Sequence, residues 1–120
     1  MKQLKSQNPE LLNTIRSLRE KAKENDATIW QDVADRLSSS KRRRVAVNLS
    51  RLNRHTKEKE TVIIPGKVLG SGRLEHPLVV AGLTFSNTAR LKISRAKGKS
   101  LAILELLKDN PKGTNVRIME

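Results

Sequence analysis

The side chains of this chain that could do chemistry are mostly cations, and many of them lie in one segment. Residues 41–59 hold eight lysines and arginines against one acid, Glu58. The same segment carries the apolar residues Val45, Val47, Leu49 and Leu52. A free basic tail would not need apolar side chains, so we predict that folded structure carries these charges. A fixed array of positive charge suits a rigid polyanion such as nucleic acid better than a small substrate.

A second basic segment follows Ser86, in a predicted helix and the residues just after it. It contains five cations and no acid, namely Arg90, Lys92, Arg95, Lys97 and Lys99. A solvated helix face normally mixes charges of both signs, so charge of a single sign indicates a binding role. We predict that the two basic segments form two edges of one phosphate-binding surface.

The residues predicted to contact nucleic acid come from these two edges and from the turn between them. The first edge would supply Lys41, Arg42, Arg43, Arg44, Arg51, Arg54 and Lys57, with the polar contacts Asn48, Asn53 and His55. The second edge would supply Arg90, Lys92, Arg95 and Lys99, and the segment between them Lys67, Gly70, Ser71 and Gly72. The glycine turn admits two interpretations. Its glycines serve either a backbone conformation with positive φ or a close approach of backbone N–H groups to phosphate.

Catalysis has little support in the sequence. The two histidines, His55 and His76, lie far apart and lack the spacing of a metal site such as H-E-x-x-H. The acids are scattered over polar helix faces, without the close pair that acid–base catalysis uses. The chain has no cysteine, which excludes disulfides and thiolate ligands. We therefore predict no enzyme activity, no cofactor and no metal, with a surface role for His55 and a turn at His76-Pro77.

The composition points to a polyanionic partner. The 120 residues have a net charge of +13, and such an excess disfavours the compact monomer by self-repulsion. Membrane surface is the rival polyanion, but no apolar run approaches the roughly 18 residues of a spanning helix, and none reads as a signal peptide. Trp30 and Phe85 are the only aromatic residues, so stacking on rings would not dominate binding. Trp30 shares a predicted helix face with Val33 and Leu37, which favours a place in the core.

The hydrophobic spacing predicts a series of short elements. The first two helices are expected at 9–24, with Asn8 as cap, and from the cap Asp26 to Leu37. A short helix is expected after the cap Asn48. Two more are expected from the cap Ser86 to a stop at Gly98, and at 105–108. Strands are expected at 45–47, at 61–65 with a stop at Pro65, within 66–72 before a glycine turn, at 78–85, at Leu101 and Ile103, and at 116–118. This alternation predicts a single mixed α/β domain over residues 1–120, helical in 1–40 and mixed in 41–120.

Several motifs, in the same order along essentially the whole chain, resemble a known family. They are Trp30 to Leu37, Val47 to Thr56, Pro65 to Gly72, Val80-Ala81 with Phe85-Ser86 and Ala89 to Ile93, and Asn110-Pro111 with Val116 to Ile118. This pattern resembles the large-subunit ribosomal protein eighteen of archaea and eukaryotes, the eighteen-e type, and the short length resembles its archaeal members. Where the family commonly ends its third helix in Gly-Gly, this chain has Lys97-Gly98.

The resemblance implies an irregular ββα superhelix, shared with the C-terminal half of bacterial large-subunit protein fifteen. It also implies a non-enzymatic structural protein of the cytoplasmic ribosome, a monomer bound to large-subunit ribosomal RNA beside neighbouring ribosomal proteins. The alternative from another class is a DNA-binding chromosomal protein, against which the scarcity of wedge-forming apolar residues argues. An RNA-modifying enzyme is a third interpretation, and it lacks a cofactor loop or a catalytic pair.

Overall fold

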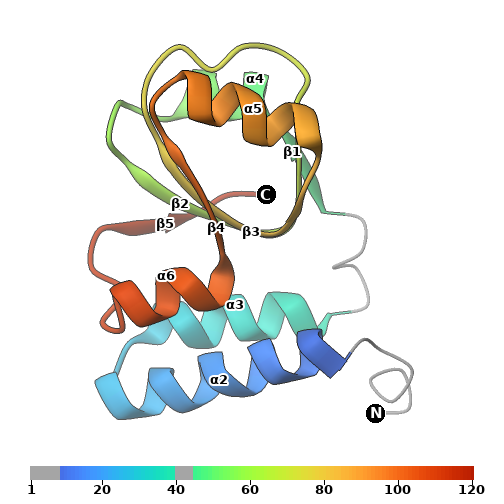
Figure 1. The fold of residues 1–120 in the computed structure, drawn as a ribbon. Coiled ribbons are helices and arrows are strands. Elements are labelled where there is room, and N and C mark those ends of the chain that lie inside the picture. Colours follow the sequence, from blue (N-terminus) through green and yellow to red (C-terminus); the bar gives the residue numbers. More distant parts are fainter. Residues whose placement is uncertain (1–8, 40–44) are drawn as a thin grey trace.

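A parallel sheet between two layers of helices forms the body of the protein (Figure 1). The computed structural model describes residues 9–39 and 45–120, so the predicted cap Asn8 and the cations Lys41 to Arg44 lie outside the described residues. The strands are β1 (Ala46–Asn48), β2 (Thr61–Leu69), β3 (Val79–Phe85), β4 (Lys99–Ala102) and β5 (Val116–Ile118). Their order is β1-β2-β3-β4, with β5 also on β2, and all of these pairings are parallel. The predicted α/β fold, with two N-terminal helices before the sheet, is confirmed.

Two helices at the start of the described chain form one layer with a third from its end. Helix α2 (Pro9–Asn25) lies against α3 (Thr28–Ser38), and α6 (Ile103–Asp109) packs beside α2 on the same side of the sheet (Figure 1). The predicted cap Asp26 was wrong. Asp26 has φ +51° and makes the turn between the helices, and the cap position falls on Ala27, which makes no side-chain capping bond. Asp is one of the few residues that tolerate a left-handed backbone, so it serves the turn instead.

The opposite face of the sheet is covered by α4 (Leu49–His55) and α5 (Asn87–Arg95) (Figure 1). Side-chain alternation along β2 sends Val62 and Ile64 into the cluster with these helices, while Ile63 joins the cluster of α2, α3 and α6. Both clusters exclude water, so each helix layer is fixed to the sheet by burial of apolar area. The predicted cap Ser86 is confirmed, because its Oγ accepts the backbone N–H of Ala89 at 3.1 Å.

The predicted strand stop at Pro65 was wrong. β2 continues through Pro65 to Leu69 as one strand, and its register with β3 shifts between Ile64 and Lys67. Proline has no N–H to give to a ladder, and an irregularity of this kind lets a strand carry it without breaking. The long strand presents one edge to both β5, near its start, and β1, near its end.

The predicted strand at Leu101 and Ile103 ends one residue earlier than expected. Ile103 is the first residue of α6 and is buried there. The carboxylate of Glu105 accepts the backbone N–H of Ala102 at 2.7 Å. This bond satisfies a donor at the helix start and fixes the change from strand to helix at that point.

The C-terminal end of α5 places a lysine where glycine is usual. The N–H of Gly98 donates to Ile93 O and the N–H of Lys97 donates to Ser94 O, both at 2.9 Å. This pair of bonds is the Schellman motif, in which the residue after the cap takes a left-handed backbone. Here that residue is Lys97, with φ +66°, so the prediction that Gly98 makes the stop needs correction. Gly98 is required for another reason, since a Cβ there would clash with the backbone of Leu78.

We expect Lys97→Gly to stabilise the fold by about 1 kcal/mol, because glycine adopts a positive φ without the strain of a Cβ. Chemical denaturation of the two proteins measures the difference. Lys97→Ala is the matched control, since it removes the same charge but keeps the Cβ. An equal gain in Lys97→Ala would attribute the effect to charge and contradict the conformational explanation.

Candidate nucleic-acid interface

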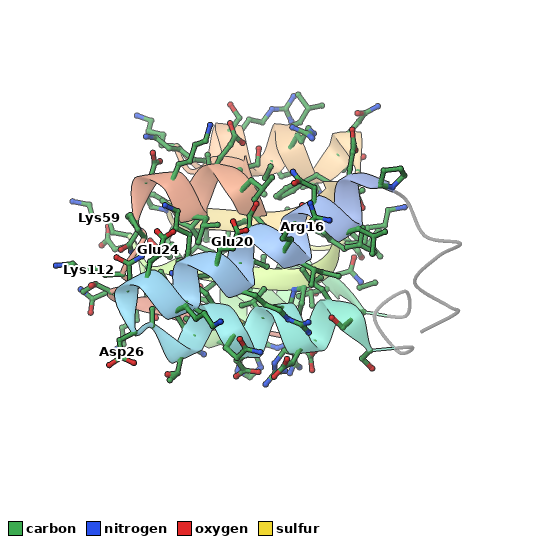
Figure 2. All side chains as sticks on the ribbon, turned by 90° about the horizontal axis from the view of Figure 1, so that it is seen from below. Arg16, Glu20, Glu24, Asp26, Lys59 and Lys112 are labelled. Atoms are coloured by element: carbon green, nitrogen blue, oxygen red, sulfur yellow. The ribbon has the colours of Figure 1, made fainter. Side chains whose placement is uncertain are left out.

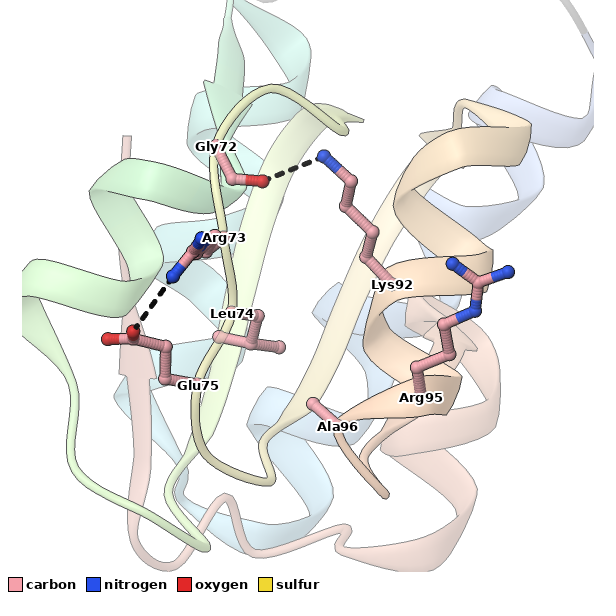
Figure 3. Close-up of a pocket in the computed structure, with 7 residues that line it drawn as sticks. All are labelled: Gly72, Arg73, Leu74, Glu75, Lys92, Arg95 and Ala96. Carbon is pink, nitrogen blue, oxygen red and sulfur yellow. Dashed lines mark hydrogen bonds and ion pairs between the residues drawn. The ribbon is translucent and has the colours of Figure 1, made fainter.

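Helices α4 and α5 lie on the same side of the sheet, and the loop of residues 70–75 runs between them (Figures 1 and 3). We call α4, this loop, α5 and the flanking residues to Lys99 the basic surface. It brings together residues from around 50, 70 and 90 in the sequence, as the two predicted edges require. Most of its predicted contact residues are exposed, namely Arg51, Arg54, His55, Lys57, Ser71, Gly72, Arg90, Arg95 and Lys99. Lys67 is exposed as well, but it belongs to β2 and not to the basic surface.

Three of the predicted contact residues, Asn48, Asn53 and Lys92, have side chains that bond to the loop of residues 70–75. The Asn48 Oδ1 accepts the backbone N–H of Ser71 at 3.1 Å. The Asn53 amide binds Glu75 twice, donating to its carboxylate at 3.1 Å and accepting its backbone N–H at 2.9 Å. On the other side of the loop, the Lys92 ammonium donates to the carbonyls of Gly70 and Gly72, at 2.7 and 2.8 Å. These side chains fix the loop to both helices.

The glycines of the turn have sufficient structural reasons. Gly72 has φ +90°, and a Cβ there would clash with Ser50 of α4. Gly70 is buried, and a Cβ there would clash with Thr88 and the backbone of Ala89 at the start of α5. The loop can therefore pass closely between the two helices only with glycine at these positions.

The exposed arginines of the basic surface differ in their surroundings. The Arg90 guanidinium lies over the ring of Phe85, 5.2 Å from its centroid. The Arg51 Nε donates to the backbone carbonyl of Glu120 at 3.1 Å. Both arrangements hold a guanidinium at the surface while leaving other N–H groups of the fork to bind an anion.

Arg73, on the loop of residues 70–75, is a candidate contact residue that the sequence did not predict. Its side chain is 86% exposed and lies 3.9 Å from the carboxylate of Glu75, which is itself 63% exposed. An ion pair this exposed contributes little to the stability of the fold, so the Arg73 guanidinium can exchange Glu75 for another anion at little cost. The signal that could have found it is its place next to Gly72, which is itself a predicted contact residue.

Helices α2 and α3, on the face of the sheet away from the basic surface, carry balanced charge. Residues 9–39 contain five lysines and arginines against six acids, whereas residues 45–120 contain fourteen against six. Three ion pairs connect α2 and α3 internally or to each other, namely Arg19–Asp35, Lys21–Glu24 and Arg36–Asp32. Figure 2 looks onto these helices and shows cations and acids, such as Arg16 and Glu20, interspersed. The positive charge of the described residues is therefore concentrated away from this layer.

The end of α4 is anchored by a network around Arg117 of β5. Arg117 donates to the backbone carbonyl of His55 at 2.7 Å and pairs with the carboxylate of Glu60 at 3.2 Å. The backbone N–H of Lys57 also donates to Glu60, at 2.7 Å. This N–H bond, followed by the Arg117 bond and charge, holds the pKa of Glu60 below its ordinary value near 4.5.

We expect Glu60→Gln to lower stability by about 1 kcal/mol near neutral pH, where the carboxylate is charged and bonded. Because the folded pKa is the lower one, this contribution is present above about pH 4.5 and is lost as pH falls through the folded value. Thermal melts between pH 3 and 7 measure it. The difference between the two proteins should shrink with acid, and a difference independent of pH would contradict the ionic explanation.

The two histidines occupy different environments. The Thr56 hydroxyl donates to Leu52 O at 2.6 Å, so it can only accept from the Nε2–H of His76, 2.8 Å away. This bond ties the predicted turn at His76 to the end of α4, while His55 is exposed. The described residues contain no group of three or more His, Asp or Glu side chains placed to bind a metal. Within the same ranges, no helix is long and apolar enough to span a membrane.

Comparison with known proteins agrees with the resemblance found in the sequence. The family model described as ribosomal protein 60S L18 and 50S L18e matches residues 1–120. Large ribosomal subunit protein eL18 of Methanothermobacter thermautotrophicus is 50% identical over 113 residues, which cover 94% of this chain and 93% of the relative. The protein of the same name from Methanoregula boonei is 49% identical, with 93% of each chain covered. The chain therefore belongs to the family of ribosomal proteins 60S L18 and 50S L18e.

Proposed function

We propose that this protein is a structural constituent of the large ribosomal subunit that binds and stabilises folded large-subunit ribosomal RNA. The basic surface would contact phosphates of RNA helices that lie against it. Membership of the family supports a structural role rather than an enzymatic one. The protein would act as a monomer within the cytoplasmic ribosome, without a cofactor.

The observation that carries this proposal is the separation of charge between the two helix layers. Residues 9–39, which form α2 and α3, balance five cations with six acids, and three of those cations form ion pairs, while the second basic segment, from Asn87 to Lys99, has five cations and no acid. Phosphate contacts position a protein on nucleic acid without reading its sequence, and single-sign surfaces of this kind supply them. The balanced layer is the surface we assign to solvent or to neighbouring ribosomal proteins.

The test compares binding of the full chain to deproteinised large-subunit ribosomal RNA and to double-stranded DNA of equal length, at one salt concentration. We expect clear preference for the ribosomal RNA, and co-sedimentation with large subunits at low magnesium and moderate salt. Equal or tighter binding to DNA, together with absence from the subunit fraction, would support the chromosomal-protein alternative and contradict the proposal.

A further inference from the structure

A shallow groove of about 450 Å³ separates the loop from α5 within the basic surface (Figure 3). Residues 72–75 line one side, and Lys92, Arg95 and Ala96 line the other. Its volume lies within the range of sites that take small organic groups. Hollows of similar or larger volume occur elsewhere on the described surface, so volume alone does not make this groove a site, and its lining is what distinguishes it.

The floor of the groove is apolar. Leu74 points toward α5 and Ala96, whereas Arg73 and Glu75 point to the other side of the loop (Figure 3). Leu74 is half-buried and packs against the core cluster below α4 and α5. The carboxylate of Glu75 is held by Asn53 of α4, so the acid lies away from this floor. Contact with a phosphate would give no favourable burial of the apolar side chains of Leu74 and Ala96. The flat face of a nucleobase would cover both and remove their apolar surface from water.

The groove is held open by bonds within the protein. The Lys92 ammonium reaches from α5 to the carbonyls of Gly70 and Gly72 and closes one end (Figure 3). Asn48 and Asn53 hold the loop from the other side. A site shaped in advance loses less freedom when a ligand enters. Arg95 is exposed and lines the same groove from α5, where it can meet the phosphate of an entering nucleotide.

We propose that this groove binds one unstacked nucleobase of the RNA, with the base on Leu74 and Ala96 and its phosphate on Arg95. Proteins commonly recognise RNA at bulges and loops, where bases leave the stack and lie against side chains. Lys92 is then a positioning residue, since its ammonium shapes the groove. This assignment rests on the proposed RNA-binding function.

The test uses the full chain and two RNA hairpins that are closed by the same non-nucleotide linker and carry equal numbers of phosphates, one fully paired and one with a single bulged nucleotide. We expect about tenfold tighter binding to the bulged hairpin, the size of one base-stacking contact. Ala96→Leu should fill the groove and remove this preference while leaving affinity for the paired hairpin unchanged. Arg90→Gln is the matched control on the same helix, and it should weaken binding to both hairpins equally.

A second variant, Leu74→Ala, removes the floor and should also reduce the preference, which keeps the test valid if Ala96→Leu does not fold. Equal binding of the two hairpins by the unmodified protein would overturn the nucleobase site. The site would also be overturned if Ala96→Leu or Leu74→Ala folds and still prefers the bulged hairpin. In both cases binding to the paired hairpin would still support the phosphate surface, whereas loss of binding to both hairpins and to ribosomal RNA would contradict the proposed function itself.

Discussion

Trp30→Ala is expected to destabilise the protein by about 3–5 kcal/mol, the largest effect of any single substitution considered. Trp30 is fully buried in the cluster that joins α2, α3 and α6 to the sheet. Its indole N–H also donates to the carbonyl of Pro111 at 2.7 Å, so truncation leaves both a cavity and an unpaired acceptor. Denaturant unfolding followed by circular dichroism measures the change.

Trp30→Phe separates the two contributions, because it keeps most of the ring volume and loses only the indole N–H. We expect this variant to lie between the wild type and Trp30→Ala. The affinity of folded Trp30→Ala for RNA should be unchanged, since the residue is on the balanced side of the molecule. A stability loss below about 1 kcal/mol with a large loss of RNA affinity would show that Trp30 is a binding residue and contradict its place in the core.

Much of the fold follows from local patterns in the sequence. The apolar face of Trp30, Val33 and Leu37 predicted α3, and the capping role of Ser86 predicted the start of α5. The errors at Asp26, Lys97 and Ile103 came from the details of helix ends, but the error at Pro65 arose because contacts distant in sequence decided the outcome. β2 continues past Pro65 because neighbouring strands pair on both of its edges, which a local rule about proline does not include.

The contact residues of the basic surface stay a prediction, but the common placement of the two basic helices follows from the sequence pattern. Because α4 and α5 bury their apolar sides against the same face of the sheet, their cations are left outside on one side of the molecule. The roles of Asn48, Asn53 and Lys92 within the protein could not be predicted. Their partners in the 70–75 loop are between 20 and 23 residues away, and no spacing rule reaches that far. The contacts of Lys41 to Arg44 stay a prediction.

Replacing Arg54, Arg90 and Arg95 together by glutamine is expected to weaken binding to ribosomal RNA on the order of 100-fold near physiological salt, if each binds one phosphate. All three side chains are exposed, and none belongs to a core cluster. The free energy of unfolding should therefore change by less than about 1 kcal/mol. The loss should be similar for different RNA sequences, because phosphate contacts carry no base information.

The most direct test of the basic surface compares how RNA affinity depends on salt in two variants. One is the triple arginine variant just described, and the other loses the same charge elsewhere on the molecule. The control replaces Arg16, Lys23 and Lys108 by glutamine, three exposed cations on α2 and α6. The slope of log affinity against log salt should flatten by about 2–3 units in the first variant, at 0.7–0.9 per phosphate contact, and by less than about 1 unit in the control. Equal flattening in both variants would mean that the charge acts as a diffuse cloud, and it would contradict a phosphate-binding surface on α4 and α5.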